Sequence, residues 1–205
     1  MKKHIGRILL AVAALLPLIR LSQSGPSSIL IFTVFTVILL WGGLRRASAK
    51  LPMPLWLHYI AAGTIFGGLT QWFVQLEGFE KSFSANPTFH FLQALTIYFW
   101  VTVVWYIVLR KYEYSTWDVF WVTGLWGVLF EAILLYGALN PLIWLFIFVV
   151  YGSFASIAHL LTRDRFPAGR PRPNFRAYSL AFGWLVLSLL LSQGTILLMQ
   201  LFGIK

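Results

Sequence analysis

The chain has 205 residues, of which 59% are hydrophobic, 18% aromatic and only 11% charged. A soluble domain carries about 25% charged residues, so this deficit, together with apolar runs of about 20 residues, indicates that lipid is the main solvent. The absence of cysteine excludes a disulfide framework, a thiolate metal site and a thiol nucleophile. No polar segment is long enough to fold separately, so we expect an all-α integral membrane protein with one helical domain over residues 1–205.

Seven apolar segments predict a polytopic bundle of about seven transmembrane helices. The first is short for a span, because Ile8–Ile19 lies between Arg7 and Arg20 and reaches only about 18 Å as a helix. It also has features of a signal peptide, although we expect it to be retained as a short span whose arginines reach the headgroups. The predicted spans are 5–23, 28–44, 55–74, 88–109, 116–136, 141–161 and 178–202.

The positive charges fall on alternate loops. Segments 1–7, 45–50, 110–111 and 163–176 contain 13 of the 16 Lys and Arg residues. Because basic loops stay in the cytoplasm, the N-terminus is predicted to be cytoplasmic and the C-terminus outside, which requires an odd number of spans. We therefore expect a multi-pass protein of a bacterial-type plasma membrane. Confinement of the net charge of +10 to these turns argues against a nucleic-acid partner.

Small residues at helical spacing indicate close helix contacts. Gly63 and Gly67 form a GxxxG pattern, and Gly152 and Ser156 repeat the small-xxx-small pattern. Such faces let two helix backbones approach closely, either within the bundle or against a membrane-protein partner.

Glu131 is the acidic residue in the middle of an apolar segment. Gly127 and Gly124 share its helix face, which predicts that Glu131 points at a neighbouring helix rather than at lipid. A carboxylate facing the lipid would cost about 3 kcal/mol on insertion scales, so Glu131 needs a proton or partners. His90 and Gln93 are the partners that we expect.

Several polar residues are predicted to share the outer half of the bundle with Glu131. Their depths follow from the predicted direction of each helix, and the faces that carry them could converge on a pocket. A buried carboxylate with a histidine at the same depth could also handle protons, so Glu131 and His90 are the catalytic candidates. The predicted ligand-binding residues are Glu131, His90, Gln93, Gln71 and Gln193, with Gln75 in the same layer.

An inner layer contains His58, Asp118 and His159. Two histidines and a carboxylate are metal-ligand types, but their spacing does not support a site, and we predict no metal. Asp118 stands early in its helix, where an acidic residue favours a capping role.

The longest polar connection, Thr162–Arg176, contains five arginines and three prolines. Arginine forks match phosphate oxygens, and a basic turn also determines topology. The sequence therefore predicts contact with anionic lipid headgroups by Arg163, Arg165, Arg170, Arg172 and Arg176.

Three classes of function remain open. The scarcity of recognisable catalytic patterns favours a protein that binds or moves a lipid or small hydrophobic molecule through a polar pocket around Glu131. An intramembrane enzyme using Glu131 and His90 for proton transfer on a lipid or isoprenoid is the first alternative. A non-catalytic accessory subunit of a larger membrane complex is the second, and no pattern indicates a cofactor.

Overall fold

The computed structural model describes residues 48–76, 86–135, 137 and 141–204. These residues are helical apart from the connections, and none of them forms a strand. The predicted spans 5–23 and 28–44 lie outside the described residues. The described elements are α4 (Leu55–Leu76), α5 (Pro87–Lys111), α6 (Thr116–Gly127), the π-helical η1 (Val128–Leu135), α7 (Pro141–Thr162), the short 3₁₀ turn η2 (Arg163–Arg165) and α8 (Phe175–Leu201).

Helix boundaries agree with the last five predicted spans to within a few residues, and side-chain caps explain where α5 and α8 begin. Asn174 accepts a hydrogen bond from the backbone N–H of Ala177 at 3.0 Å, so α8 begins at Phe175 rather than at residue 178. Asn86 caps α5 in the same way, with a proline at the start of that helix. Each cap satisfies a backbone donor that the first turn leaves unpaired.

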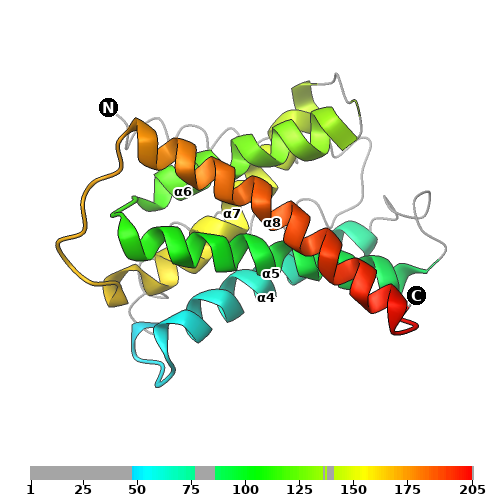
Figure 1. Cartoon of the computed structure of the whole chain (residues 1–205), viewed down its shortest axis with the longest axis horizontal. Coiled ribbons are helices and arrows are strands. Elements are labelled where there is room, and N and C mark those ends of the chain that lie inside the picture. Colours follow the sequence, from blue (N-terminus) through cyan, green and yellow to red (C-terminus); the bar gives the residue numbers. More distant parts are fainter. Residues whose placement is uncertain (1–47, 77–85, 136, 138–140, 205) are drawn as a thin grey trace.

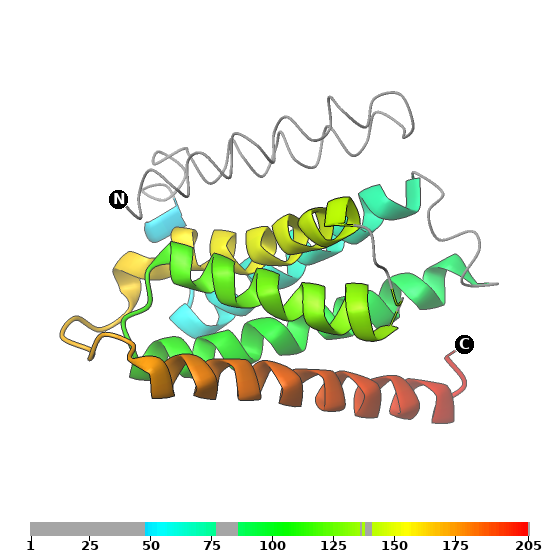
Figure 2. The same cartoon turned by 90° about the horizontal axis from the view of Figure 1, so that it is seen from above.

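Successive helices run in opposite directions along an elongated bundle (Figure 1). α4 packs on α5 and α6 packs on α7, and α7 also contacts α4 and α5. α8 packs along the outer side of α5 (Figure 2). The connections that carry the basic residues 110–111 and 163–176 lie at one end of the bundle, together with residues 48–54 (Figure 2).

α7 is the enclosed helix of the bundle. All of its side chains from Ile147 to Thr162 are buried. A Cβ on Gly152 would lie 2.7 Å from the backbone oxygen of Phe120, which confirms that this glycine marks a close contact, here with α6. Small residues thus let the two helices approach closely.

The GxxxG pattern of α4 also packs inside the chain. A Cβ on Gly63 would lie 1.9 Å from the Thr102 side chain, and one on Gly67 would lie 2.3 Å from Tyr98. Both contacts are with α5. The two small-residue faces that the sequence singled out are therefore covered within the described bundle.

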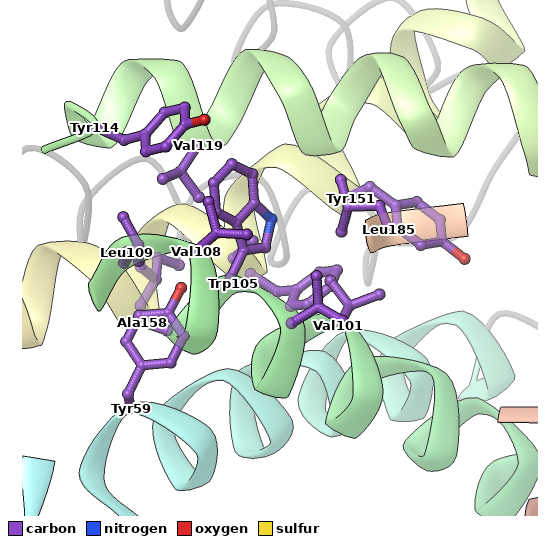
Figure 3. Packing of buried hydrophobic residues seen from close by; sticks show 14 of the residues in the cluster. Tyr59, Val101, Trp105, Val108, Leu109, Tyr114, Val119, Tyr151, Ala158 and Leu185 are labelled. Atoms are coloured by element: carbon purple, nitrogen blue, oxygen red, sulfur yellow. The ribbon is translucent and has the colours of Figure 1, made fainter. Parts of the chain in front are cut away.

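Aromatic side chains fill the core between α5, α6 and α7. The fully buried Trp105 lies among aliphatic residues of α5 and α6, with Tyr114 nearby (Figure 3). Its indole N–H donates to Thr123 at 2.8 Å, and its ring meets Tyr114 edge-on at 5.5 Å. A buried tryptophan donor needs such an acceptor, so this bond joins α5 to α6 in one geometry.

Three helical stretches of the described chain are long and apolar enough to cross a membrane. They are Thr88–Lys111, Trp144–Arg165 and Phe175–Leu201. The all-helical fold class and the transmembrane helices that composition predicted are thereby confirmed at this level.

Candidate functional site

Glu131 lies in a segment whose helical geometry changes. α6 begins as a regular helix and continues after Gly127 as the π-helical η1, whose first turn contains Glu131. A π-helix adds one residue to each turn, is rare beyond a single turn, and occurs frequently at functional sites. Hydrophobic periodicity does not reveal such a change, so the sequence predicts residues 116–136 as one uniform span.

The face of α6 below Glu131 packs against α7, as the two glycines predicted. A Cβ on Gly124 would lie 2.8 Å from Phe148, and one on Gly127 would lie 2.6 Å from Tyr151. Glu131 itself is half-buried, one helical turn beyond Gly127. Its expected hydrogen bond with His90 or Gln93 stays a prediction.

The neighbouring Phe130 connects η1 to α8. Its ring centroid lies 6.2 Å from that of Phe182 and 5.8 Å from that of Trp126. From this contact, η1 diverges from α8 toward the end of the bundle opposite the basic loops (Figure 1). Glu131 therefore lies where these two elements separate.

Polar residues of α4 and α5 occupy the same half of the bundle. Gln71 is buried and accepts a hydrogen bond from the Tyr98 hydroxyl at 3.3 Å. Gln75, His90 and Gln93 are half-buried near the adjoining ends of the two helices. The role of Tyr98 was not predictable from the sequence, because an aromatic residue in an apolar helix gives no signal of a polar role.

Gln193 differs from the other predicted ligand-binding residues. Its side chain is exposed, whereas its neighbour Ser192 is fully buried against α5. Ser192 and Thr96 share a hydrogen bond of 2.8 Å between their hydroxyl groups. One turn further, the Trp100 indole N–H donates to Thr195 at 2.9 Å. The face of α8 that meets α5 therefore carries hydroxyl groups, and Gln193 points away from it.

An open, mostly apolar groove lies between the start of α5 and the end of α8. Its lining contains three apolar residues and one amide: Phe89, Leu197, Leu201 and Gln200. The groove is at the same end of the bundle as His90. An acyl chain or another hydrophobic group matches this lining.

The inner-layer residues are held in separate interactions at the basic end. Asp118 forms a capping box with Ser115, and its second carboxylate oxygen accepts from the Tyr178 hydroxyl at 2.9 Å. The predicted capping role of Asp118 is thus confirmed. His159 is buried and contacts the Thr116 hydroxyl at 3.3 Å. Within the described ranges, no group of three His, Cys, Asp or Glu residues could hold a metal.

His58 belongs to a clamp between α4 and the turn after α7. Its Nδ1 lies 2.9 Å from the Arg165 guanidinium, which also donates to the backbone oxygen of Met53. Its Nε2 lies 2.8 Å from the Ser48 hydroxyl. Because the guanidinium is always a donor, Nδ1 accepts here, and His58 is neutral with its proton on Nε2.

Arg170 is fixed in a similar way to the end of α5. Its guanidinium donates to the backbone oxygens of Leu109 and Tyr112, and its charge lies 5.0 Å from the centre of the Phe166 ring. Partial burial lowers the pKa of Arg170, and Glu113 opposes that shift. A cation at these carbonyls compensates the negative end of the helix dipole.

The five loop arginines therefore divide into two groups. Arg165 and Arg170 bind backbone carbonyls, while the other three are exposed: Arg163, Arg172 and Arg176. Arg163 lies 3.6 Å from the carboxylate of Asp164. Sequence could not separate these groups, because the carbonyl partners of Arg165 and Arg170 are more than 50 residues away.

Comparison with known proteins does not add a family to this geometry. The chain matches no protein-family model, no curated protein and no solved structure.

Proposed function

We propose that this is a multi-pass membrane protein that binds a lipid or another small hydrophobic molecule in the half of the bundle opposite the basic loops, with Glu131 at the centre of the site. The observation that carries the proposal is the position of Glu131 in the first turn of η1. A charged residue in an apolar segment and a π-helical turn each indicate function, and here they coincide.

The surroundings of Glu131 favour a hydrophobic ligand with a polar group. Leu129, Ile133 and Leu134 of η1 are exposed, so the carboxyl group is the polar member of an apolar segment. The divergence of η1 from α8 leaves the two elements without the close packing that joins α6 to α7 (Figure 1). A lipid headgroup or hydroxyl would interact with Glu131, while its chain would follow the apolar helix surfaces toward the groove at Phe89 and Leu197.

The proposed topology has seven spans, a cytoplasmic N-terminus and an external C-terminus in a bacterial-type plasma membrane. It is supported by the location of the described basic connections at one end of the bundle. A topology reporter inserted at the exposed Gly169, which has a φ of +79°, should be located in the cytoplasm. A reporter fused at Lys205 should be located outside the cell. The reverse pattern would overturn this topology and the assigned depths.

Substitution of Glu131 tests the site. Glu131→Gln keeps the shape and one acceptor but removes the charge and the titratable proton. A hydrogen bond to a charged group contributes about 1.5–3 kcal/mol, against about 1 kcal/mol for a neutral bond, so the retained ligand should fall roughly tenfold. The measurement is mass spectrometry of lipids that copurify with the protein in mild detergent, with thermal unfolding followed in parallel.

The matched control is Leu125→Gln, which places the same amide on an exposed position of α6, outside η1. It should retain the ligand. Equal retention by Glu131→Gln and the wild-type protein would remove Glu131 from the site. A silent Glu131→Gln with an unstable Glu131→Leu would reduce Glu131 to a structural hydrogen-bonding role.

An accessory subunit is the second proposal, supported by the outer face of α8. Among the described residues, no atom lies within 4 Å of a Cβ placed on Gly183 or Gly194, and Leu190 and Leu197 are exposed on the same helix. A stable partner in mild detergent, with unchanged lipid content in Glu131→Gln, would favour this function. The enzyme alternative depends on Glu131 with His90 and would instead show loss of turnover in Glu131→Gln.

A further inference from the structure

Exposed cations and an exposed aromatic ring lie on the two segments that meet at the basic end of the bundle. We call this group the cationic rim and define it as Arg110, Lys111, Arg172, Phe175 and Arg176. Phe175 is 88% exposed, the largest exposed fraction among the big apolar side chains of the described residues. The four cations are also exposed.

Backbone contacts bring these residues together although they come from two parts of the chain. The N–H of Glu113 donates to the oxygen of Pro171 at 2.9 Å. Arg170 donates to Leu109 and Tyr112, the residues that flank Arg110 and Lys111. The segment before α8 is therefore fixed on the end of α5, with Arg172 next to the basic pair.

The start of α8 is fixed to the same surface. Its Tyr178 donates to Asp118, and the Tyr178 and Tyr114 rings meet edge-on at 5.4 Å. Phe175 and Arg176 consequently project from an anchored first turn. A cation in the first turn opposes the helix dipole, and an anionic partner would offset that unfavourable interaction.

The length of α8 places the rim at headgroup depth. Its 27 residues extend about 40 Å, whereas the hydrocarbon core of a bilayer is about 30 Å thick. If the apolar centre of α8 occupies the core, its first turn extends into the headgroup layer. Phosphates and the upper acyl carbons are then within reach of the arginines and of Phe175.

We infer that the cationic rim binds anionic phospholipid, with Arg172, Arg176, Arg110 and Lys111 at the headgroup and Phe175 against the upper acyl chain. Arg165 and Arg170 are not part of this site, because their guanidinium groups bind backbone carbonyls. The exposed apolar ring next to the cations favours a lipid over a free phosphate ion, which gains nothing from Phe175. Glu113 is an exposed acid beside the rim. It balances only one of the four cations, so the rim keeps an excess of positive charge.

The test measures the preference of the full-length protein for phosphatidylglycerol over phosphatidylcholine. The protein is equilibrated in mixed micelles of the two lipids, and the lipids that it retains are counted by native mass spectrometry. An arginine near an anionic surface contributes about 1 kcal/mol, so Arg172→Gln with Arg176→Gln should lower the preference roughly 30-fold. Phe175→Ala should reduce retention of both lipids without changing the preference.

Arg163, for which the sequence predicted a headgroup contact, is not part of the rim, because its guanidinium lies 3.6 Å from the Asp164 carboxylate. Arg163→Gln is therefore the matched control, since it removes an exposed arginine of the same connection. It should change the preference less than twofold. The inference fails if Arg163→Gln lowers the lipid preference as much as Arg172→Gln alone. The preference would then depend on the net charge of the protein and not on one binding site. The inference also fails if the folded double variant keeps the wild-type preference, or if inorganic phosphate displaces the phosphatidylglycerol. The rim lies at the opposite end from Glu131, so these outcomes are separate from those of the proposed function.

Discussion

α7 and α8 are similar in length and hydropathy, yet they occupy opposite environments. In the apolar window of α7, 83% of the residues are buried, against 22% in that of α8. Hydropathy therefore identifies a helix that can enter a membrane but does not say whether it faces protein or lipid. The difference is clearest in the glycines, because Gly152 of α7 meets Phe120 of α6, whereas a Cβ on Gly183 or Gly194 of α8 would meet none of the described residues within 4 Å.

Glycine substitution gives the largest effect that this comparison predicts. Gly152→Val on α7 would place a Cβ 2.7 Å from a backbone oxygen of α6, which cannot move without shifting the helix. We expect destabilisation of about 3 kcal/mol, the upper range for overpacking. The measurement is the free energy of unfolding from a denaturing-detergent titration in mixed micelles.

Gly194→Val on α8 is the control for that substitution. In the described part of the chain, nothing lies within 4 Å of a Cβ placed there. The helix propensity of valine is also no worse than that of glycine. The unfolding free energy of this variant should stay within about 0.5 kcal/mol of wild type. If both valine variants were equally unstable, the enclosed and open roles of the two helices would be wrong.

Much of the fold was predictable from the sequence because membrane spans depend on length and apolar composition. Residues 55–76, 87–111, 141–162 and 175–201 form helices close to their predicted limits. The sequence also predicted that Gly124 and Gly127 meet a neighbouring helix, since small residues at helical spacing have few other uses in lipid. The identity of that helix, α7, depends on three-dimensional packing and was not predictable.

The site was less predictable, because its features depend on geometry rather than residue type. The residue types from Val128 to Leu135 do not indicate a π-helix, since a π-helix differs from an α-helix in which carbonyl accepts a hydrogen bond from each N–H. Arg165 and Arg172 are the same residue type in one short connection. Only the fold brings the Met53 carbonyl and His58 to the first and leaves the second exposed.

The smallest predicted effect concerns how α8 is attached. The buried hydroxyl of Ser192 lies 2.8 Å from that of Thr96, but Thr96 also donates to the backbone oxygen of Gln93 at 2.7 Å. Ser192→Ala therefore leaves Thr96 with a partner, and hydrogen bonds between membrane helices average about 0.6 kcal/mol. We expect a loss of about that size in the same unfolding titration.

Ser179→Ala is the matched control, because the exposed Ser179 hydroxyl bonds only to Phe175 in its own helix among the described residues. It should be silent. The test depends on which serine variant loses more unfolding free energy rather than on the size of either loss. Both losses should be small, since α8 lacks the deep burial of α7. If Ser192→Ala cost as much as Gly152→Val, one polar contact would fix α8 as firmly as close packing fixes α7. The outer helix α8 would then be part of the rigid core. A ligand could not move α8 to enter the space where η1 and α8 separate.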